Sequence, residues 1–104
     1  MTPFTLSLAA VLAAAAPGAL AQGAPHPELG RNLAATCANC HGTGGKTVAG
    51  SPVAALAGRP KDDFVRTMND FRDGKRPASI MHQLAKGFTP EQIDAMAAWF
   101  AAQK

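Results

Sequence analysis

The chain has 104 residues, of which 47% are hydrophobic, and a formal net charge of +3 at pH 7. This length holds one small domain, and no internal repeat or long linker interrupts it. The positive balance is weak and is not gathered into a basic stripe, which argues against a nucleic-acid-binding protein.

Residues 1–21 have the pattern of a secretory signal peptide. An apolar run over residues 4–16 precedes Pro17 and Gly18, and the small-x-small sequence Ala19-Leu20-Ala21 follows. The pattern predicts cleavage after Ala21, export to the periplasm and a working domain of residues 22–104. The run is too short to span a bilayer. No Lys or Arg precedes it, so retention as an uncleaved anchor remains an alternative.

A first helix is expected over residues 28–39, ended by the glycine-rich residues 42–45. The last turn of this helix contains the start of the sequence Cys37-Ala38-Asn39-Cys40-His41. This sequence has the C-x-x-C-H spacing of a c-type haem attachment site. On a helix, thiols three residues apart share one face and can form thioethers with two porphyrin vinyl groups. We therefore predict one covalent haem c on Cys37 and Cys40, with the imidazole of His41 as an axial iron ligand.

Other uses of a C-x-x-C pair need weighing. A thioredoxin-like redox pair would accompany strands, and no strand pattern is present. A zinc site would need two further ligands at close spacing, and the sequence has no second C-x-x-C and no H-x-H. A structural disulfide or dithiol pair stays open as an alternative.

Residues 46–59 are expected to form a loop of glycine, proline, serine and small apolar residues. Val48, Val53 and Leu56 can pack on a haem face from this loop. A backbone carbonyl near Pro52 can accept a hydrogen bond from the second ring nitrogen of His41. Alternatively, Pro52 only stiffens the loop.

A second helix is predicted over residues 60–73, with Asp62 and Asp63 in its first turn, where negative charge suits the helix dipole. Phe64, Met68 and Phe71 form its apolar stripe. The basic residues that follow are either a partner-facing charge or a solvated helix end.

Residues 78–87 are expected to hold a turn or two of helix, and the last helix follows. Thr89 is its predicted N-cap, with Pro90 at the first helical position and Gln92 completing a capping box. Its apolar face comprises Ile93, Met96, Ala97 and Phe100.

The second axial position of the iron has four candidate ligands: Met68, Met81, His82 and Met96. Met68 and Met96 lie on apolar stripes and are interpreted as packing. Met81 lies forty residues after His41, which leaves enough chain to wrap the haem and return on its other side. We predict Met81 as this ligand, with His82 or an open position as alternatives. A thioether opposite an imidazole raises the reduction potential, which suits an electron carrier.

These features together resemble class I cytochromes c over nearly all of residues 22–104. Residues 64–74, 79–89 and 93–100 are similar to the cytochrome subunit of flavocytochrome c sulfide dehydrogenase. The resemblance implies an all-α fold of helices around one haem, with Met81 as the sixth ligand. It also implies that the first and last helices cross near Gly30 and the Trp99–Phe100 pair.

The chain departs from these relatives in two respects. Cytochrome subunits of that type often have two haem domains, whereas this chain has one C-x-x-C-H. Related cytochromes often place a proline where this chain has Ala54, two residues before Leu56-Ala57-Gly58. The carbonyl that would orient His41 therefore stays open.

The sequence predicts a periplasmic electron-transfer protein that is not an enzyme by itself. The resemblance implies an FAD-containing, sulfide-oxidising flavoprotein as its electron donor and another cytochrome or an oxidase as its acceptor. One alternative is a free-standing cytochrome c that serves a terminal oxidase or another reductase. Another is a haem protein with an open sixth site, which binds ligands or acts as a peroxidase.

Overall fold

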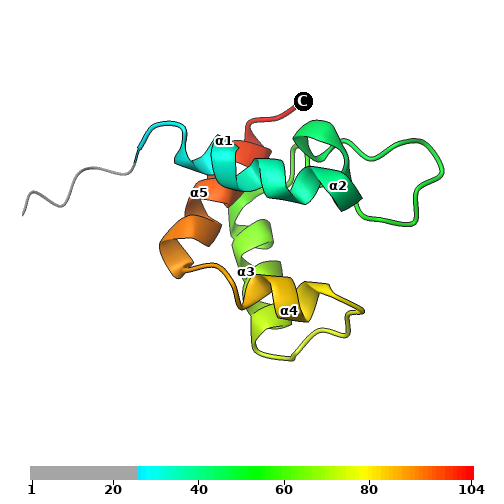
Figure 1. Cartoon of the computed structure of the whole chain (residues 1–104), viewed down its shortest axis with the longest axis vertical. Helices are drawn as coiled ribbons and strands as arrows, with labels where there is room; N and C mark the ends of the chain where they lie inside the picture. The colour runs from blue at the N-terminus through cyan, green and yellow to red at the C-terminus, as the bar shows by residue number, and fades with distance from the viewer. Residues whose placement is uncertain (1–25) are drawn as a thin grey trace, which may run out of the picture.

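The computed structural model describes residues 26–104, so the expected signal peptide at residues 1–21 lies outside the described residues. Helices and loops make up all of this part of the chain, as the all-α expectation required (Figure 1). Five α-helices and two short 3-10 helices follow in the order α1 (Leu29–Ala34), η1 (Ala35–Cys37), α2 (Ala38–His41), η2 (Thr43–Gly45), α3 (Lys61–Arg72), α4 (Met81–Ala85) and α5 (Pro90–Ala101).

The first helical run is longer and less regular than the sequence predicted. It continues to His41 through a 3-10 turn at Ala35–Cys37. At that turn the Thr36 hydroxyl donates to the Leu33 carbonyl at 2.7 Å, a local bond of the kind that competes with regular helix geometry. The run stops at Gly42, where φ is 81° and where a Cβ atom would lie 2.0 Å from the Lys46 carbonyl oxygen. Only glycine fits this stop.

The predicted starts of α3 and α5 are confirmed. Pro60 is the N-cap residue of α3, and Asp62 and Asp63 lie in its first turn. At α5, the Gln92 backbone N–H donates to the Thr89 hydroxyl at 3.2 Å. The Thr89 N–H donates in return to the Gln92 side-chain oxygen at 2.9 Å, which completes the capping box.

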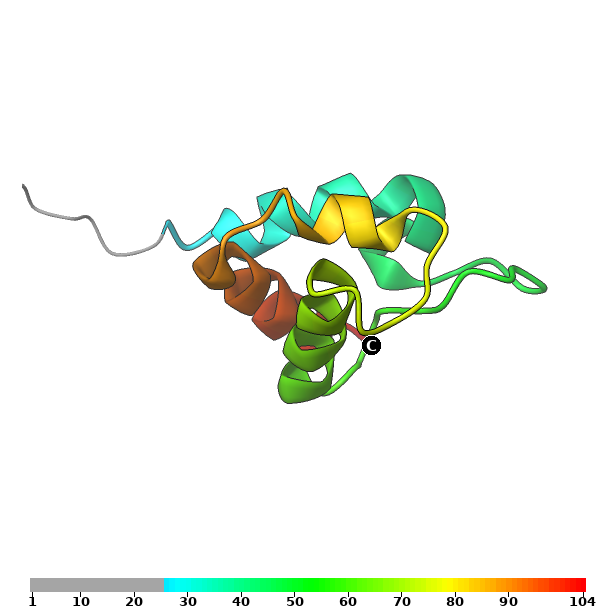
Figure 2. The same ribbon diagram turned by 90° about the horizontal axis from the view of Figure 1, so that it is seen from below.

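Helix α5 supplies most of the core. Its predicted apolar face, Ile93, Met96, Ala97 and Phe100, is at most 1% exposed. The Phe100 ring packs on Trp99 edge-on and on Phe64 at a tilt, with centroid separations of 5.1 and 5.4 Å. Helix α5 packs against α1, and α3 packs against α5 and α4. Figures 1 and 2 show this arrangement, while the loop after η2 extends away from the helices.

The first and last helices cross at Gly30, as the family resemblance implied. A Cβ atom at Gly30 would lie 2.5 Å from the Ala95 carbonyl oxygen and 3.2 Å from the Trp99 Cβ. Since the nearest obstacle is backbone, a larger residue would push the two helices apart. Among residues 26–104, no helix has both the length and the apolarity needed to cross a membrane.

The crossing makes Gly30 sensitive to a single methyl group. Helix propensity alone favours Ala over Gly by about 1 kcal/mol, but overpacking against backbone costs about 1–3 kcal/mol. We expect Gly30→Ala to lower the free energy of unfolding, measured by guanidinium titration of the haem-containing protein. Asn32→Ala, at an exposed site on the same helix, is the control and should leave stability unchanged or slightly higher. A Gly30→Ala protein as stable as the parent would contradict the close crossing.

Candidate functional site

A cavity of about 560 Å³ contains all four expected site residues in its lining: Cys37, Cys40, His41 and Met81. Its walls come from η1, α2, α3 and α4, from the loop between η2 and α3, and from the loop between α3 and α4. The apolar part of the lining includes Val53, Leu56, Phe64, Met68, Phe71, Leu84 and Phe88. The expectation that Val48 packs here was wrong, because Val48 is 77% exposed on the extended loop and does not belong to this lining.

The two cysteines reach the cavity from consecutive helical segments, Cys37 at the end of η1 and Cys40 within α2. Both are free thiols in the structure. Burial raises the pKa of the Cys37 thiol, and the hydrogen bond between Thr36 and Cys37 only partly opposes this effect. Cys37 therefore stays protonated at neutral pH. Its neighbour Cys40 is exposed at the cavity edge.

The backbone carbonyl of Ala54 orients His41. The distance from His41 Nδ1 to the Ala54 oxygen is 2.6 Å. A carbonyl oxygen can only accept a hydrogen bond, so Nδ1 must carry the ring proton and Nε2 keeps its lone pair. This is the arrangement of a metal-ligating histidine with its supporting partner. The expected loop carbonyl is therefore present, and Ala54 rather than Pro52 supplies it.

The Ala54 carbonyl is held in place by the return of the loop. The backbone N–H groups of Leu56 and Ala57 both donate to the Gly45 carbonyl, at 2.8 and 3.1 Å. Gly45 is buried with a positive φ of 76°, and a Cβ there would lie 2.8 Å from both Ala57 N and the Phe100 ring. The loop is thus tied directly to the end of the cysteine-bearing run.

The candidates for a sixth ligand divide into two groups. Met81, the first residue of α4, and Met68, in α3, line the cavity. Met96 is fully buried in the core, and neither Met96 nor His82 lines the cavity. The α4 segment is tied to α3 by the Arg72 guanidinium, which donates to the Phe88 carbonyl.

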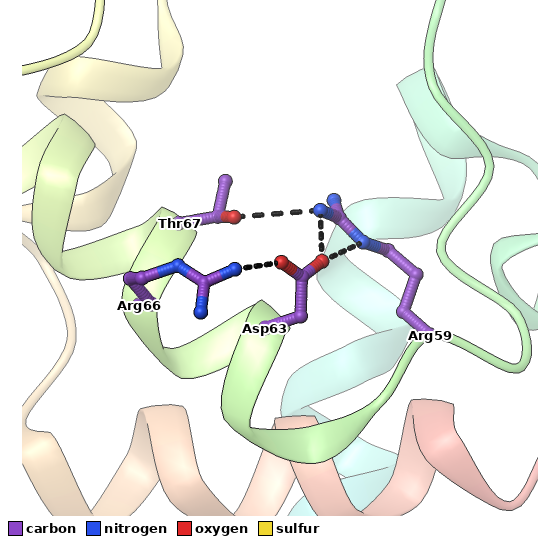
Figure 3. A network of polar contacts seen from close by, with 4 residues as sticks. All are labelled: Arg59, Asp63, Arg66 and Thr67. Atoms are coloured by element: carbon purple, nitrogen blue, oxygen red, sulfur yellow. Dashed lines mark hydrogen bonds and ion pairs between the residues drawn. The ribbon is translucent and has the colours of Figure 1, made fainter.

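Two arginines in the lining were missed by the sequence reasoning. Arg59, just before α3, donates through Nε and Nη2 to one Asp63 oxygen at 3.1 and 2.6 Å, and through Nη2 to Thr67 at 3.4 Å (Figure 3). Arg66 donates to the other Asp63 oxygen. The hydrogen bond from Arg59 is the main cause that lowers the pKa of Asp63. The positive charges of Arg59, Arg66 and Arg76 lower this pKa further. The Arg-x-x-x-Asp spacing was a signal that could have revealed the pair.

Arg76 lies in the loop between α3 and α4. Its guanidinium lies over the Phe71 ring, 5.5 Å from the centroid, a cation–π geometry. Arg76 also lines the cavity. The basic residues after the second predicted helix were expected to be partner-facing or solvated, and the position of one of them at the cavity was not foreseen.

The cavity matches the chemistry of a haem. Its volume lies within the usual range for ligand sites of about 300–1,000 Å³, and most of its walls are apolar. Two thiols, an imidazole with a free Nε2 lone pair and a thioether are available for attachment and ligation. Arg59 and Arg76 line it, and no described acidic residue does, which suits a group that carries carboxylates. Within residues 26–104, no three His, Cys, Asp or Glu side chains cluster as a separate metal site.

A family model matches residues 25–100 of the chain, and its description is cytochrome c oxidase, cbb3-type, subunit III. The chain is also 34% identical over 71 residues to the cytochrome subunit of sulfide dehydrogenase from Chlorobaculum tepidum, which covers 68% of this chain and 63% of that protein. It is 36% identical over 103 residues to the thiosulfate dehydrogenase electron acceptor of Thiomonas intermedia, a match that covers 90% of this chain and 44% of that protein.

A third relative is matched over nearly all of its own length. Cytochrome c-554(548) of Halomonas halodenitrificans is 32% identical over 79 residues, which cover 72% of this chain and 93% of that protein. The chain therefore spans less than two thirds of the length of the first two relatives, the cytochrome subunit and the electron acceptor. It spans nearly all of cytochrome c-554(548).

The Asp63 network predicts a pH-dependent contribution to stability. Because the folded pKa of Asp63 lies below its ordinary value of 3.8, ionised Asp63 stabilises the fold above about pH 4, and this contribution is lost as pH falls through the folded pKa. We expect Asp63→Asn to unfold at lower urea concentration than the parent at pH 7, with a difference that narrows below pH 4.

Asp62→Asn is the matched control, since Asp62 lies in the same helical turn and makes no ion pair among the described residues. It should reproduce any helix-dipole effect without the effect of the network. An Asp63→Asn difference that is equal at pH 7 and pH 3 would rule out the linkage.

Proposed function

The chain belongs to the cytochrome c family represented by the cbb3-type subunit III model, and from this premise we propose that Cys37 and Cys40 attach its haem while His41 and Met81 ligate the iron. Its cofactor is covalent haem c, and it is an electron-transfer protein rather than an enzyme. We further propose that residues 1–21 are a signal peptide cleaved after Ala21, and that residues 22–104 work in the periplasm as the cytochrome domain.

The observation that carries the ligand proposal is the His41–Ala54 hydrogen bond. It assigns the ring proton to Nδ1 and holds the imidazole plane, so Nε2 needs no reorganisation to bind iron. When bound, the haem supplies one-electron chemistry at its iron. The protein's part is to hold the two ligands and to keep water away with the apolar lining.

Met81 is preferred to Met68 as the second ligand because the two side chains are packed differently. Met68 is 5% exposed, belongs to the core cluster and sits in the middle of the twelve-residue α3. Met81 is half-buried at the start of the five-residue α4 and packs against the core only from its edge. Ligation by Met81 therefore removes no core side chain from its packing.

The specific role we propose is the electron-accepting cytochrome subunit beside a sulfide-oxidising flavoprotein that contains FAD. The support is the similarity to a protein named as the cytochrome subunit of sulfide dehydrogenase, together with the likeness of the segment around Met81 to that family. In this role another cytochrome or an oxidase takes the electron onward. The sulfide chemistry would belong to the flavoprotein.

A second candidate is a free-standing carrier that serves a terminal oxidase or another reductase. It is favoured by the match to nearly the whole length of cytochrome c-554(548). A further relative is named as a thiosulfate dehydrogenase electron acceptor. This similarity makes an enzyme that oxidises thiosulfate another candidate electron donor for such a carrier.

Replacing Met81 tests the ligand proposal. We expect Met81→Ala to keep its covalent haem, to lose the weak near-infrared methionine–iron band of the ferric protein and to have a strongly lowered reduction potential. Met68→Leu is the matched control and should retain both the band and the potential. If the band survives in Met81→Ala and disappears in Met68→Leu, then Met68 is the ligand. Rapid cyanide binding by the unmodified ferric protein would instead indicate an open sixth site.

Native purification tests the partner proposal. A permanent subunit should co-elute from gel filtration with a protein that contains FAD, and the isolated complex should reduce its haem when sulfide is added. Elution as a lone haem protein, reduced only by an added donor, would overturn the subunit role in favour of the free carrier. Mass spectrometry of the same material reports cleavage after Ala21 directly.

A further inference from the structure

Two guanidinium groups contact side chains of α3 that are one helical turn apart and line the cavity. Arg59 Nη2 reaches Thr67 at 3.4 Å, and the Arg76 guanidinium lies over Phe71. Thr67 and Phe71 are four residues apart in α3, and both line the cavity. Residues at this spacing are neighbours on one helix face, so the two cations approach the cavity from the same side.

Their charges are not equally compensated. Arg59 shares Asp63 with Arg66, so one carboxylate serves two cations. Arg76 makes no ion pair among the described residues and rests on an aromatic ring. The cavity wall therefore carries net positive charge. Arg59 is only 26% exposed at its side chain, so water screens its attraction for an anion less than that of Arg76, which is exposed at the cavity edge.

Arg59 also has donors to spare. Its bonds to Asp63 and Thr67 use Nε and Nη2, while Nη1 has no hydrogen-bond partner within the described chain. Figure 3 shows that this third nitrogen points away from Asp63. The arrangement leaves a guanidinium held on one edge with its other edge available to a second carboxylate.

Haem carries two carboxylates on one edge of the porphyrin, which matches two cations on one side of the cavity. We propose, resting on the function proposed above, that Arg59 and Arg76 each bind one haem carboxylate and that Asp63 is the positioning residue that holds Arg59 for this contact. Both cations then favour the reduced iron, which carries one positive charge fewer than the oxidised iron, and so raise the reduction potential.

Arg66 provides a matched control within the same network. It pairs with the same carboxylate as Arg59 but is 68% exposed at its side chain, against 26% for Arg59, and it does not line the cavity. Solvent and salt therefore screen its charge more effectively. Replacing either arginine removes the same formal charge, so the two variants differ in the contact with the cavity and in the solvent exposure of the charge that is lost.

The experiment measures the reduction potentials of Arg59→Gln, Arg76→Gln and Arg66→Gln in the holoprotein. We expect the first two to fall below the parent and Arg66→Gln to stay close to it. Arg59→Lys keeps the charge but not the fork of donors, so its reduction potential should lie between those of Arg59→Gln and the parent. If Arg59→Gln does not fold, Arg59→Lys takes its place in the comparison. Equal shifts in Arg59→Gln and Arg66→Gln, or no shift in Arg59→Gln and Arg76→Gln, would overturn the carboxylate contact.

A double-mutant cycle tests the role of Asp63. If Asp63 acts by positioning Arg59, the potential shifts of Asp63→Asn and Arg59→Gln are non-additive; additive shifts would overturn that role. Covalent haem content and the methionine–iron band are recorded for every variant and for the parent. Absence of both from the parent would refute the proposed haem ligation, whereas a parent with both and arginine variants without a shift would refute only the present inference.

Discussion

The hydrogen bond between His41 Nδ1 and the Ala54 carbonyl is the contact on which the site depends. It joins the end of the cysteine-bearing run to the loop that faces it, and the loop is fixed in turn by two bonds to the Gly45 carbonyl. Movement of either element would change the imidazole orientation. Three backbone hydrogen bonds at the start and end of the loop therefore fix its position, as the hydrogen bonds of a helix or strand would. One of them runs from the Gly58 N–H to the Phe100 carbonyl at 2.9 Å.

Helix α3 combines two roles that are separate in many small domains. Phe64 and Met68 belong to the core and line the cavity at once, while Thr67 and Phe71 contact the two arginines. One helix face thus sets both the packing of the fold and the polarity of the cavity wall. Substitutions along it affect stability and electron affinity together, so each measurement on α3 needs a separate check of folding.

The elements with local signals were predictable from the sequence. Thr89, Pro90 and Gln92 define the start of α5 through bonds within one turn, and the spacing of Cys37, Cys40 and His41 located one wall of the cavity. The residues alone could not select the Ala54 carbonyl, because every residue has such a group and only the path of an irregular loop brings one to His41. The family resemblance had marked position 54, but the missing proline left the choice open. Arg59 was overlooked because its place in the cavity depends on packing between segments that are distant in the sequence.

The close approach of Gly30 to Ala95 and Trp99 also determines when the fold can close. The two contacting helices lie near opposite ends of the described chain, so α1 lacks this packing partner until residues 90–101 come to lie beside it. Until then the thiols of Cys37 and Cys40 belong to a short helical run that is marginal on its own. Covalent attachment at these thiols before α5 docks would therefore take place on a pliable segment rather than in a finished pocket.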